Sequence, residues 1–216
     1  MKRDFYRELP DGYREDKIID AKNAKVAVIM NVAAVVVMIA TYLITDFIAC
    51  GRLTIIDVFT DLFGDDFAEQ NFGSFMLSLL PVLIYAAATL VYTVLHELTH
   101  GVAYKILTGE KLTFGLTASV AYCGVPNIYV GKKTSLIAIL SPFVLFSVIF
   151  IIAVALSGAT PVGLLFKTVF ATHVGGCVGD LYGAGLLIFR YKKGCLVKDD
   201  GPKQIFFVRD EDKTDL

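Results

Sequence analysis

Four long apolar runs constrain the fold of this chain more than any other feature. They cover residues 26–45, 75–108, 136–156 and 163–189. Each run is long enough to cross the roughly 30 Å hydrocarbon core of a bilayer as a helix. Of the 216 residues, 56% are hydrophobic, which is more than an ordinary soluble domain contains. The sequence therefore predicts an all-α membrane protein with four transmembrane helices, and its first expected partner is the lipid bilayer.

The charges between these runs predict how the helices are oriented. The loop of residues 46–74 contains six acidic residues and one basic residue, whereas basic residues follow the second and fourth runs. Under the positive-inside rule, both termini and the segment 105–133 are expected on the cytoplasmic side of the cell membrane. This orientation predicts a cytoplasmic N-terminal segment (1–25), a membrane domain (26–189) and a cytoplasmic C-terminal tail (190–216).

The segment between the second and third runs has a pattern of its own. Apolar and polar side chains alternate along residues 112–123, which is typical of a β-strand. Residues 124–127 contain Gly and Pro, the usual residues of a turn, and they precede a short apolar stretch at 128–130. We therefore expect a small β-hairpin at the cytoplasmic rim, although a structured loop over the helix ends would fit the same pattern.

Composition argues against several classes of protein. The net charge is −1 and the basic residues are not clustered with aromatic side chains, so no nucleic-acid partner is expected. The four cysteines contain no C-x-x-C pair, which argues against a disulfide framework and against a cysteine zinc site. A cleavable signal peptide is not expected either, because the first 25 residues are highly charged.

A short polar motif interrupts the second apolar run, at residues 96–100 (His-Glu-Leu-Thr-His). On a helix, His96 and His100 share one face and can occupy two corners of a Zn²⁺ coordination shell. Glu97 lies beside them, where a carboxylate can act on a water molecule at the metal. Burying such groups in a membrane is costly, so a function is the default hypothesis. The alternative is that the helix ends here and the three side chains lie among lipid headgroups.

A catalytic zinc ion needs a third protein ligand. Asp180 lies nine residues before the end of the fourth run, about 14 Å from the cytoplasmic rim at ~1.5 Å per residue. The histidine pair lies at a similar depth if the second helix ends near Thr108, so we expect Asp180 to be the third ligand. His173 lies about 10 Å further out on the same helix face and is the alternative ligand or a supporting hydrogen-bond partner. Cys177 ranks third.

Three short motifs carry a resemblance to a known family: His96-Glu97-Leu98-Thr99-His100-Gly101, Ser141-Pro142-Phe143 and Gly179-Asp180-Leu181. In these motifs the chain resembles the putative zincin peptidases, small bacterial integral membrane proteins formerly known only as a domain of unknown function. It is more remotely similar to the site-2 protease class of intramembrane metalloproteases, from which it departs in lacking that class's Leu-Asp-Gly motif. The similarity covers roughly residues 75–189.

This resemblance implies a site and a substrate class. It implies Zn²⁺ held by two histidines and an aspartate, which here are His96, His100 and Asp180. It also implies that Glu97 is the general base and that the substrate is a peptide bond in a membrane-associated peptide or protein. In the site-2 class a substrate strand pairs with a sheet edge near the zinc, a role that the hairpin of residues 112–130 would fill here.

The leading hypothesis is thus a zinc-dependent intramembrane or juxtamembrane peptidase, a zinc metalloprotease. The main alternative is a non-catalytic metal-binding membrane protein, such as a transporter or sensor. A third interpretation, a structural membrane protein with buried histidines, requires no metal. Glu97 distinguishes the first two hypotheses, because a protein that only binds metal has no need of a base.

Overall fold

The structure is a computed structural model that describes residues 4–54, 57, 76–77, 79–117 and 121–211. The chain forms two compact units. The first unit comprises Met1–Ala33, Thr93–Val144 and Cys177–Leu216, and the second comprises Ala34–Tyr92 and Leu145–Gly176. Each unit is described separately below.

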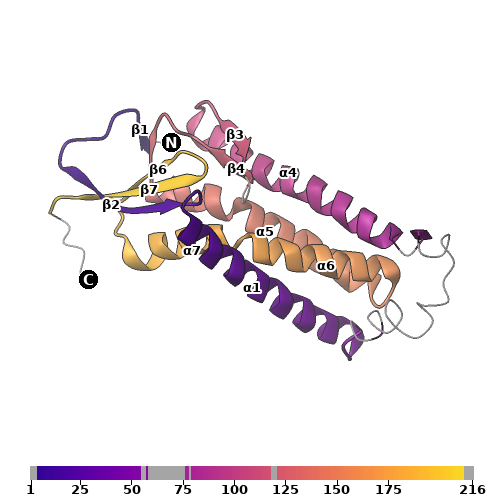
Figure 1. The fold of residues 1–216 in the computed structure, drawn as a ribbon. Coiled ribbons are helices and arrows are strands. Elements are labelled where there is room, and N and C mark those ends of the chain that lie inside the picture. Colours follow the sequence, from indigo (N-terminus) through magenta and orange to yellow (C-terminus); the bar gives the residue numbers. More distant parts are fainter. Residues whose placement is uncertain (1–3, 55–56, 58–75, 78, 118–120, 212–216) are drawn as a thin grey trace. The chain divides into compact units, whose positions relative to one another are not determined.

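Helices account for most of the described chain (Figure 1). They are α1 (Ala24–Cys50), α4 (Leu80–Thr108), α5 (Lys132–Ser157), α6 (Pro161–Gly176), α7 (Val178–Gly185) and the π-helical turn η2 (Leu186–Arg190). Four helical stretches are long and apolar enough to cross a membrane: Ala24–Cys50, Leu80–Thr108, Lys132–Ser157 and Pro161–Arg190. The four apolar runs thus correspond to four helices, as predicted.

The fourth of these stretches is not an uninterrupted α-helix. α6 ends at Gly176 and α7 begins at Val178, with Cys177 between them at φ −76° and ψ 0°. Two glycines precede this point, and glycine is a poor helix former. The expectation of one unbroken helix through His173 and Asp180 was therefore wrong.

The first unit contains a five-stranded antiparallel sheet that the sequence patterns did not predict (Figure 1). Its strands, in spatial order, are β1 (Phe5–Tyr6), β5 (Tyr129–Gly131), β6 (Leu196–Asp199), β7 (Lys203–Arg209) and β2 (Tyr13–Asp20). Four of the five strands come from the N-terminal segment and the C-terminal tail. The chain is therefore mostly helical, as predicted, but it is not all-α.

The expected hairpin is present with a different pairing. β3 (Thr113–Leu116) pairs with β4 (Ala121–Gly124), so the alternating run of residues 112–123 folds back on itself. The short stretch at 128–130, expected to be the second strand, overlaps β5 and pairs with β1 and β6 instead. Three residues cannot supply hydrogen-bond partners for the backbone groups of the whole run of residues 112–123. When that run folds back, its two ends pair with each other.

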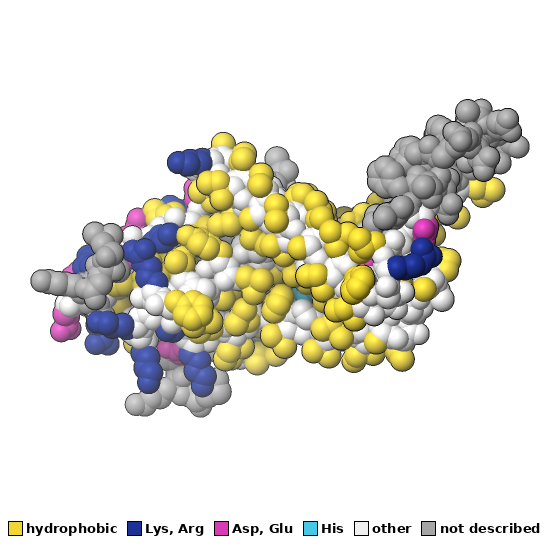
Figure 2. Space-filling view, turned by 90° about the horizontal axis from the view of Figure 1, so that it is seen from below, with side chains coloured by type: hydrophobic (Ala, Val, Ile, Leu, Met, Phe, Trp, Pro, Cys, Tyr) yellow, Lys and Arg dark blue, Asp and Glu magenta, His cyan; other side chains and the backbone are white. Residues whose placement is uncertain are grey.

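Each unit has its own apolar core. In the first unit, side chains of α5, α7, η2 and the sheet form a buried cluster: Ile139, Ala184, Leu187, Tyr191, Cys195, Val197, Phe206 and Val208. In the second unit, α4, α5 and α6 contribute an aromatic cluster: Tyr92, Phe146, Phe150, Val169 and Phe170. Hydrophobic side chains cover much of the surface that Figure 2 shows. The exposed large hydrophobic residues include Val36, Leu90 and Ile151. A lipid-facing helix needs such a surface.

Candidate metal centre

Helix α4 places the two predicted histidines one turn apart. The Nε2 atoms of His96 and His100 are 3.2 Å apart, and their ring centroids are separated by 4.9 Å. Both residues are buried, with exposed fractions of 6% and 7%. The spacing of four residues thus brings two imidazole nitrogens to one point, as helix geometry requires.

Asp180 approaches the same point from the first turn of α7. Its Oδ2 atom lies 3.3 Å from Nε2 of His96 and 3.4 Å from Nε2 of His100. A tetrahedral zinc ion with bonds of about 2.0–2.1 Å separates its ligand atoms by roughly 3.3–3.4 Å. Two imidazoles and a carboxylate are also ligands that zinc accepts. The three side chains therefore fit a zinc ion in both distance and chemistry.

The orientation of His100 is fixed by a backbone carbonyl of α5. Nδ1 of His100 lies 2.8 Å from the carbonyl oxygen of Ala138, so Nδ1–H donates and Nε2 keeps its lone pair. This carbonyl is available because the residue four positions later, Pro142, has no N–H to donate within the helix. The hydroxyl of Ser141 also donates to it, at 2.8 Å. The Ser141-Pro142 pair therefore has a specific role in this site.

Glu97 lies on the neighbouring face of α4, against the β3–β4 hairpin. It is close enough to Cys123 in β4 for the two residues to interact electrostatically. One turn later, a Cβ atom on Gly101 would lie 2.7 Å from Cζ of Phe114 and 3.2 Å from Sγ of Cys123. Only glycine allows the helix to approach the hairpin this closely. The hairpin therefore packs on the face of α4 that carries the predicted base.

The thiol of Cys123 is a poor candidate for a ligand or nucleophile. Burial, followed by the charges of Asp199 and Glu97, raises the pKa of this thiol to about 12. It therefore stays protonated at neutral pH, whereas metal binding and nucleophilic attack both require the thiolate.

Comparison with known families agrees with this chemistry. A family model described as "Putative zincin peptidase" matches residues 89–196, which is half of the chain. The chain belongs to this family. No curated protein and no solved structure is significantly similar to it. The segment that matches the zincin peptidase family begins within α4 and ends at the first residue of β6, so it includes all five predicted site residues.

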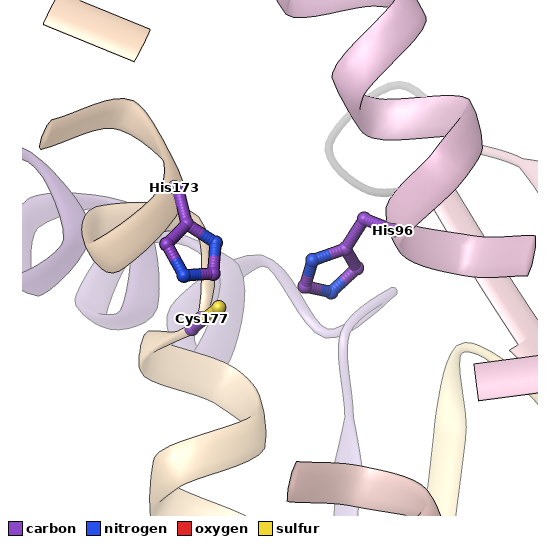
Figure 3. A group of neighbouring side chains, drawn as sticks. All are labelled: His96, His173 and Cys177. Carbon is purple, nitrogen blue, oxygen red and sulfur yellow. The ribbon is translucent and has the colours of Figure 1, made fainter. Parts of the chain in front are cut away.

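His173, the rival third ligand, belongs to the second unit. Its Nδ1 lies 2.7 Å from the hydroxyl of Tyr92, and its Nε2 lies 3.1 Å from the hydroxyl of Ser147. Figure 3 shows His173 on α6, His96 on α4, and Cys177 just before α7. Both ring nitrogens of His173 therefore already have hydrogen-bond partners, as in a structural histidine of a helical core.

One group of this candidate metal centre was not predicted from the sequence. It is the carbonyl of Ala138, which orients His100. Backbone groups occur at every position, so residue type does not reveal them. For Ala138 a signal did exist, because a proline four residues later frees a helix carbonyl.

Proposed function

We propose that this chain is a zinc-dependent peptidase that hydrolyses peptide bonds of membrane-associated substrates. The observation that carries the proposal is the triangle formed by Nε2 of His96, Nε2 of His100 and Oδ2 of Asp180. Its three sides measure 3.2, 3.3 and 3.4 Å. A zincin peptidase needs such a set of three protein ligands, with the fourth position left for water and substrate.

His96, His100 and Asp180 would hold the ion, and each has a distinct part. The chemistry that zinc supplies when bound is activation of water and polarisation of the scissile carbonyl. Asp180 brings a negative charge that offsets part of the charge of the ion. The Ala138 carbonyl keeps His100 in the tautomer whose Nε2 can donate its lone pair, and such supporting contacts make a ligand more basic.

Glu97 would move the proton. Its carboxylate would take a proton from the attacking water and deliver it to the nitrogen of the leaving amine, which is general base and then general acid catalysis. The β3–β4 hairpin, which packs on this face of α4 at Gly101, would limit the rotation of this carboxylate. A proton acceptor held in one orientation needs less reorganisation when the reaction begins.

We further propose that both termini are cytoplasmic and that substrates approach along the hairpin. The charge distribution between the helices supports the orientation. Strand β3 supports the second proposal, because its Phe114 and Leu116 are 49% and 80% exposed. A peptide bond in a bilayer is normally held within a helix, so a substrate has to unwind, and pairing with a strand edge would stabilise its extended form. Reporter fusions at each terminus test the orientation.

The decisive experiment compares wild type with Glu97→Gln in nanodiscs. We expect both proteins to bind about one zinc per chain. Cleavage of single-span membrane-anchored peptides, followed by mass spectrometry, should be roughly 10²–10⁴-fold slower in Glu97→Gln, because proton transfer contributes about that much. His96→Ala should lose the metal as well, and His173→Gln should keep it.

The same comparison separates this proposal from a transporter or sensor that only binds metal. Such a protein needs no base, so Glu97→Gln would keep its function. Equal cleavage by wild type and Glu97→Gln would show that the catalytic proposal is wrong. Loss of zinc in His173→Gln but not in Asp180→Ala would show that the ligand set is wrong.

A further inference from the structure

The turn between β6 and β7 contacts the hairpin that packs on the Glu97 face of α4. Gly201 in this turn has φ +90°, a conformation that favours glycine. A Cβ atom on Gly201 would lie 2.2 Å from the ring of Tyr122 in β4. A Cβ atom on Gly124, also in β4, would lie 2.4 Å from the backbone nitrogen of Gly201. The backbone of the turn is therefore packed directly on β4, one residue to either side of Cys123.

A buried hydrogen-bond network joins the same turn to α4. Asp199 is 3% exposed, and the hydroxyl of Tyr104 donates to its Oδ2 at 2.8 Å. The backbone N–H of Gly201 donates to its Oδ1 at 3.0 Å, and the N–H of Val125 donates to its carbonyl oxygen at 2.9 Å. Tyr104 lies four residues after His100 in α4, so it is on the same face one turn further along. The turn thus contacts both elements that define the position of Glu97.

We propose that Asp199 and Gly201 are positioning residues, which hold β4 against the face of α4 that carries Glu97. This inference rests on the proposed function, in which Glu97 transfers the proton. Both residues lie outside the segment 89–196 that matches the zincin peptidase family. The C-terminal tail therefore completes the centre.

The network predicts a specific kinetic defect. Loosening the turn would release the orientation of Glu97, but the metal ligands on α4 and α7 would keep their places. The turn packs on β4, whereas the substrate is proposed to pair with the exposed edge of β3. We therefore expect kcat to fall while KM and the zinc content stay unchanged. A role in general stability would instead lower the yield of folded protein and leave kcat per folded molecule unaltered.

The first test compares Gly201→Ala with the matched control Gly12→Ala. Both glycines have positive φ, +90° and +76°, so both substitutions strain the backbone in the same way. Only at Gly201 does the new Cβ collide with a ring, since the nearest atom at Gly12 is 3.9 Å away. We expect kcat to fall by roughly 10- to 100-fold in Gly201→Ala, the size of a small misplacement of a catalytic group. Gly12→Ala should stay close to wild type.

The second test does not depend on activity. The chain has four cysteines, so ¹⁵N-cysteine labelling gives the Cys123 amide one of four resonances. Tyr104→Phe removes one hydroxyl from the network and should speed hydrogen exchange at Cys123. The amide of Cys195, which donates to the Lys192 carbonyl, serves as the internal reference and should not change.

The outcomes of the two tests distinguish this inference from the proposed function. Faster exchange at Cys123 in Tyr104→Phe supports the positioning role, even if Glu97→Gln proves to have no effect on cleavage. Unchanged exchange at Cys123 in Tyr104→Phe overturns the positioning role, even if Glu97→Gln abolishes cleavage. Equal kcat in Gly201→Ala and Gly12→Ala overturns it too. If Gly201→Ala does not fold, Tyr104→Phe alone decides the question.

Discussion

Each of the two units places a carboxylate within its helices, and the two carboxylates have different partners. In the second unit, Asp46 forms an ion pair with Lys167 and accepts two hydrogen bonds from Thr54, at 2.6 and 2.7 Å. In the first unit, Asp180 lies beside the imidazoles of His96 and His100. Asp46 is thus neutralised by a side chain of the chain itself, whereas Asp180 belongs to a set of atoms that suits a cation.

The histidines repeat this difference. Both ring nitrogens of His173 face hydroxyl groups, which can donate or accept as the tautomer requires. In His100, Nδ1 is fixed by a carbonyl and Nε2 faces two other potential ligand atoms. Ionisable or polar groups at membrane depth are usually taken as a sign of function. The comparison shows that the arrangement of their partners is the better criterion.

The largest effect is expected from Asp180→Ala, which removes a ligand from the proposed zinc centre. Loss of a supporting hydrogen bond alone lowers metal affinity by about 10- to 100-fold, so loss of a ligand should cost more than that. Zinc content after dialysis and peptide cleavage should both fall. The folded protein should persist, because Asp180 makes no ion pair with a lysine or arginine among the described residues.

Asp46→Ala is the matched variant of the second unit, and it tests whether Asp180 rather than Asp46 is the carboxylate needed for zinc binding. It should leave zinc content and kcat per folded molecule unchanged. If Asp46→Ala loses zinc while Asp180→Ala keeps it, the assignment of the two carboxylates is wrong.

The cost of Asp46→Ala should appear in stability instead. Lys167 is 1% exposed, so the substitution leaves a buried ammonium group without its counter-charge. Such a loss destabilises a protein by about 3 kcal/mol or more. Unfolding by titration with dodecyl sulfate would measure it. The double variant Asp46→Leu/Lys167→Met should recover most of the stability, because it removes both charges together. A double variant as unstable as Asp46→Ala would argue against the ion pair.

This ion pair also shows where charge patterns mislead. Long basic side chains near helix ends commonly extend toward a membrane interface, and Lys167 is such a side chain near the start of the fourth apolar run. The structure instead buries it against Asp46, which lies 121 residues earlier in the chain. Residue type indicated correctly that a charge in an apolar run needs compensation, but it did not identify the partner.

Sequence reasoning identified the side chains of the candidate site better than it identified the secondary-structure elements around them. His96, Glu97 and His100 share a local motif, and Asp180 was found because few acidic residues occur in the apolar runs. The five-stranded sheet was missed because its pairing is long-range. Tyr13, for example, pairs with Arg209, and β2 carries charged residues on a strand without alternation. Such pairing depends on the whole chain, and no short window of sequence encodes it.

A third carboxyl, that of Asp199, is buried and has neither a lysine nor a histidine as hydrogen-bond partner among the described residues, and it extends the comparison to pH. Burial raises its pKa to about 6 from an ordinary value of 3.8, although its bonds to Gly201 and Tyr104 oppose the change. The folded protein therefore binds this proton more tightly than the unfolded chain does. The contribution of Asp199 to the free energy of unfolding should therefore be greatest below about pH 4. This contribution should be lost as the pH rises through 6.

The size of this effect can be measured on chelator-treated protein between pH 4 and 7. A pKa difference of about two units corresponds to roughly 3 kcal/mol as an upper value. Asp199→Asn carries no ionisable group, so its stability should lose this part of the pH dependence. Identical pH profiles for wild type and Asp199→Asn would mean that the carboxyl is better solvated than its 3% exposure indicates.

The smallest effect is expected from Pro142→Ala, which probes the carbonyl that distinguishes His100 from His173. Alanine restores the N–H that α5 lacks at this position, and that N–H can donate to Ala138. The carbonyl oxygen has two lone pairs, so the new bond should weaken the one from Nδ1 of His100 without abolishing it. We expect zinc affinity, measured by chelator competition, to fall by about tenfold or less.

Ser141→Ala is the control for this experiment, because the hydroxyl of Ser141 donates to the same oxygen. Removing that competing donor should leave zinc affinity unchanged or slightly raise it. Opposite effects of the two substitutions would show that the carbonyl of Ala138 tunes the ligand. If Pro142→Ala binds zinc as tightly as wild type, the proline affects only the shape of α5. His100 and His173 would then differ only in the groups that surround Nε2.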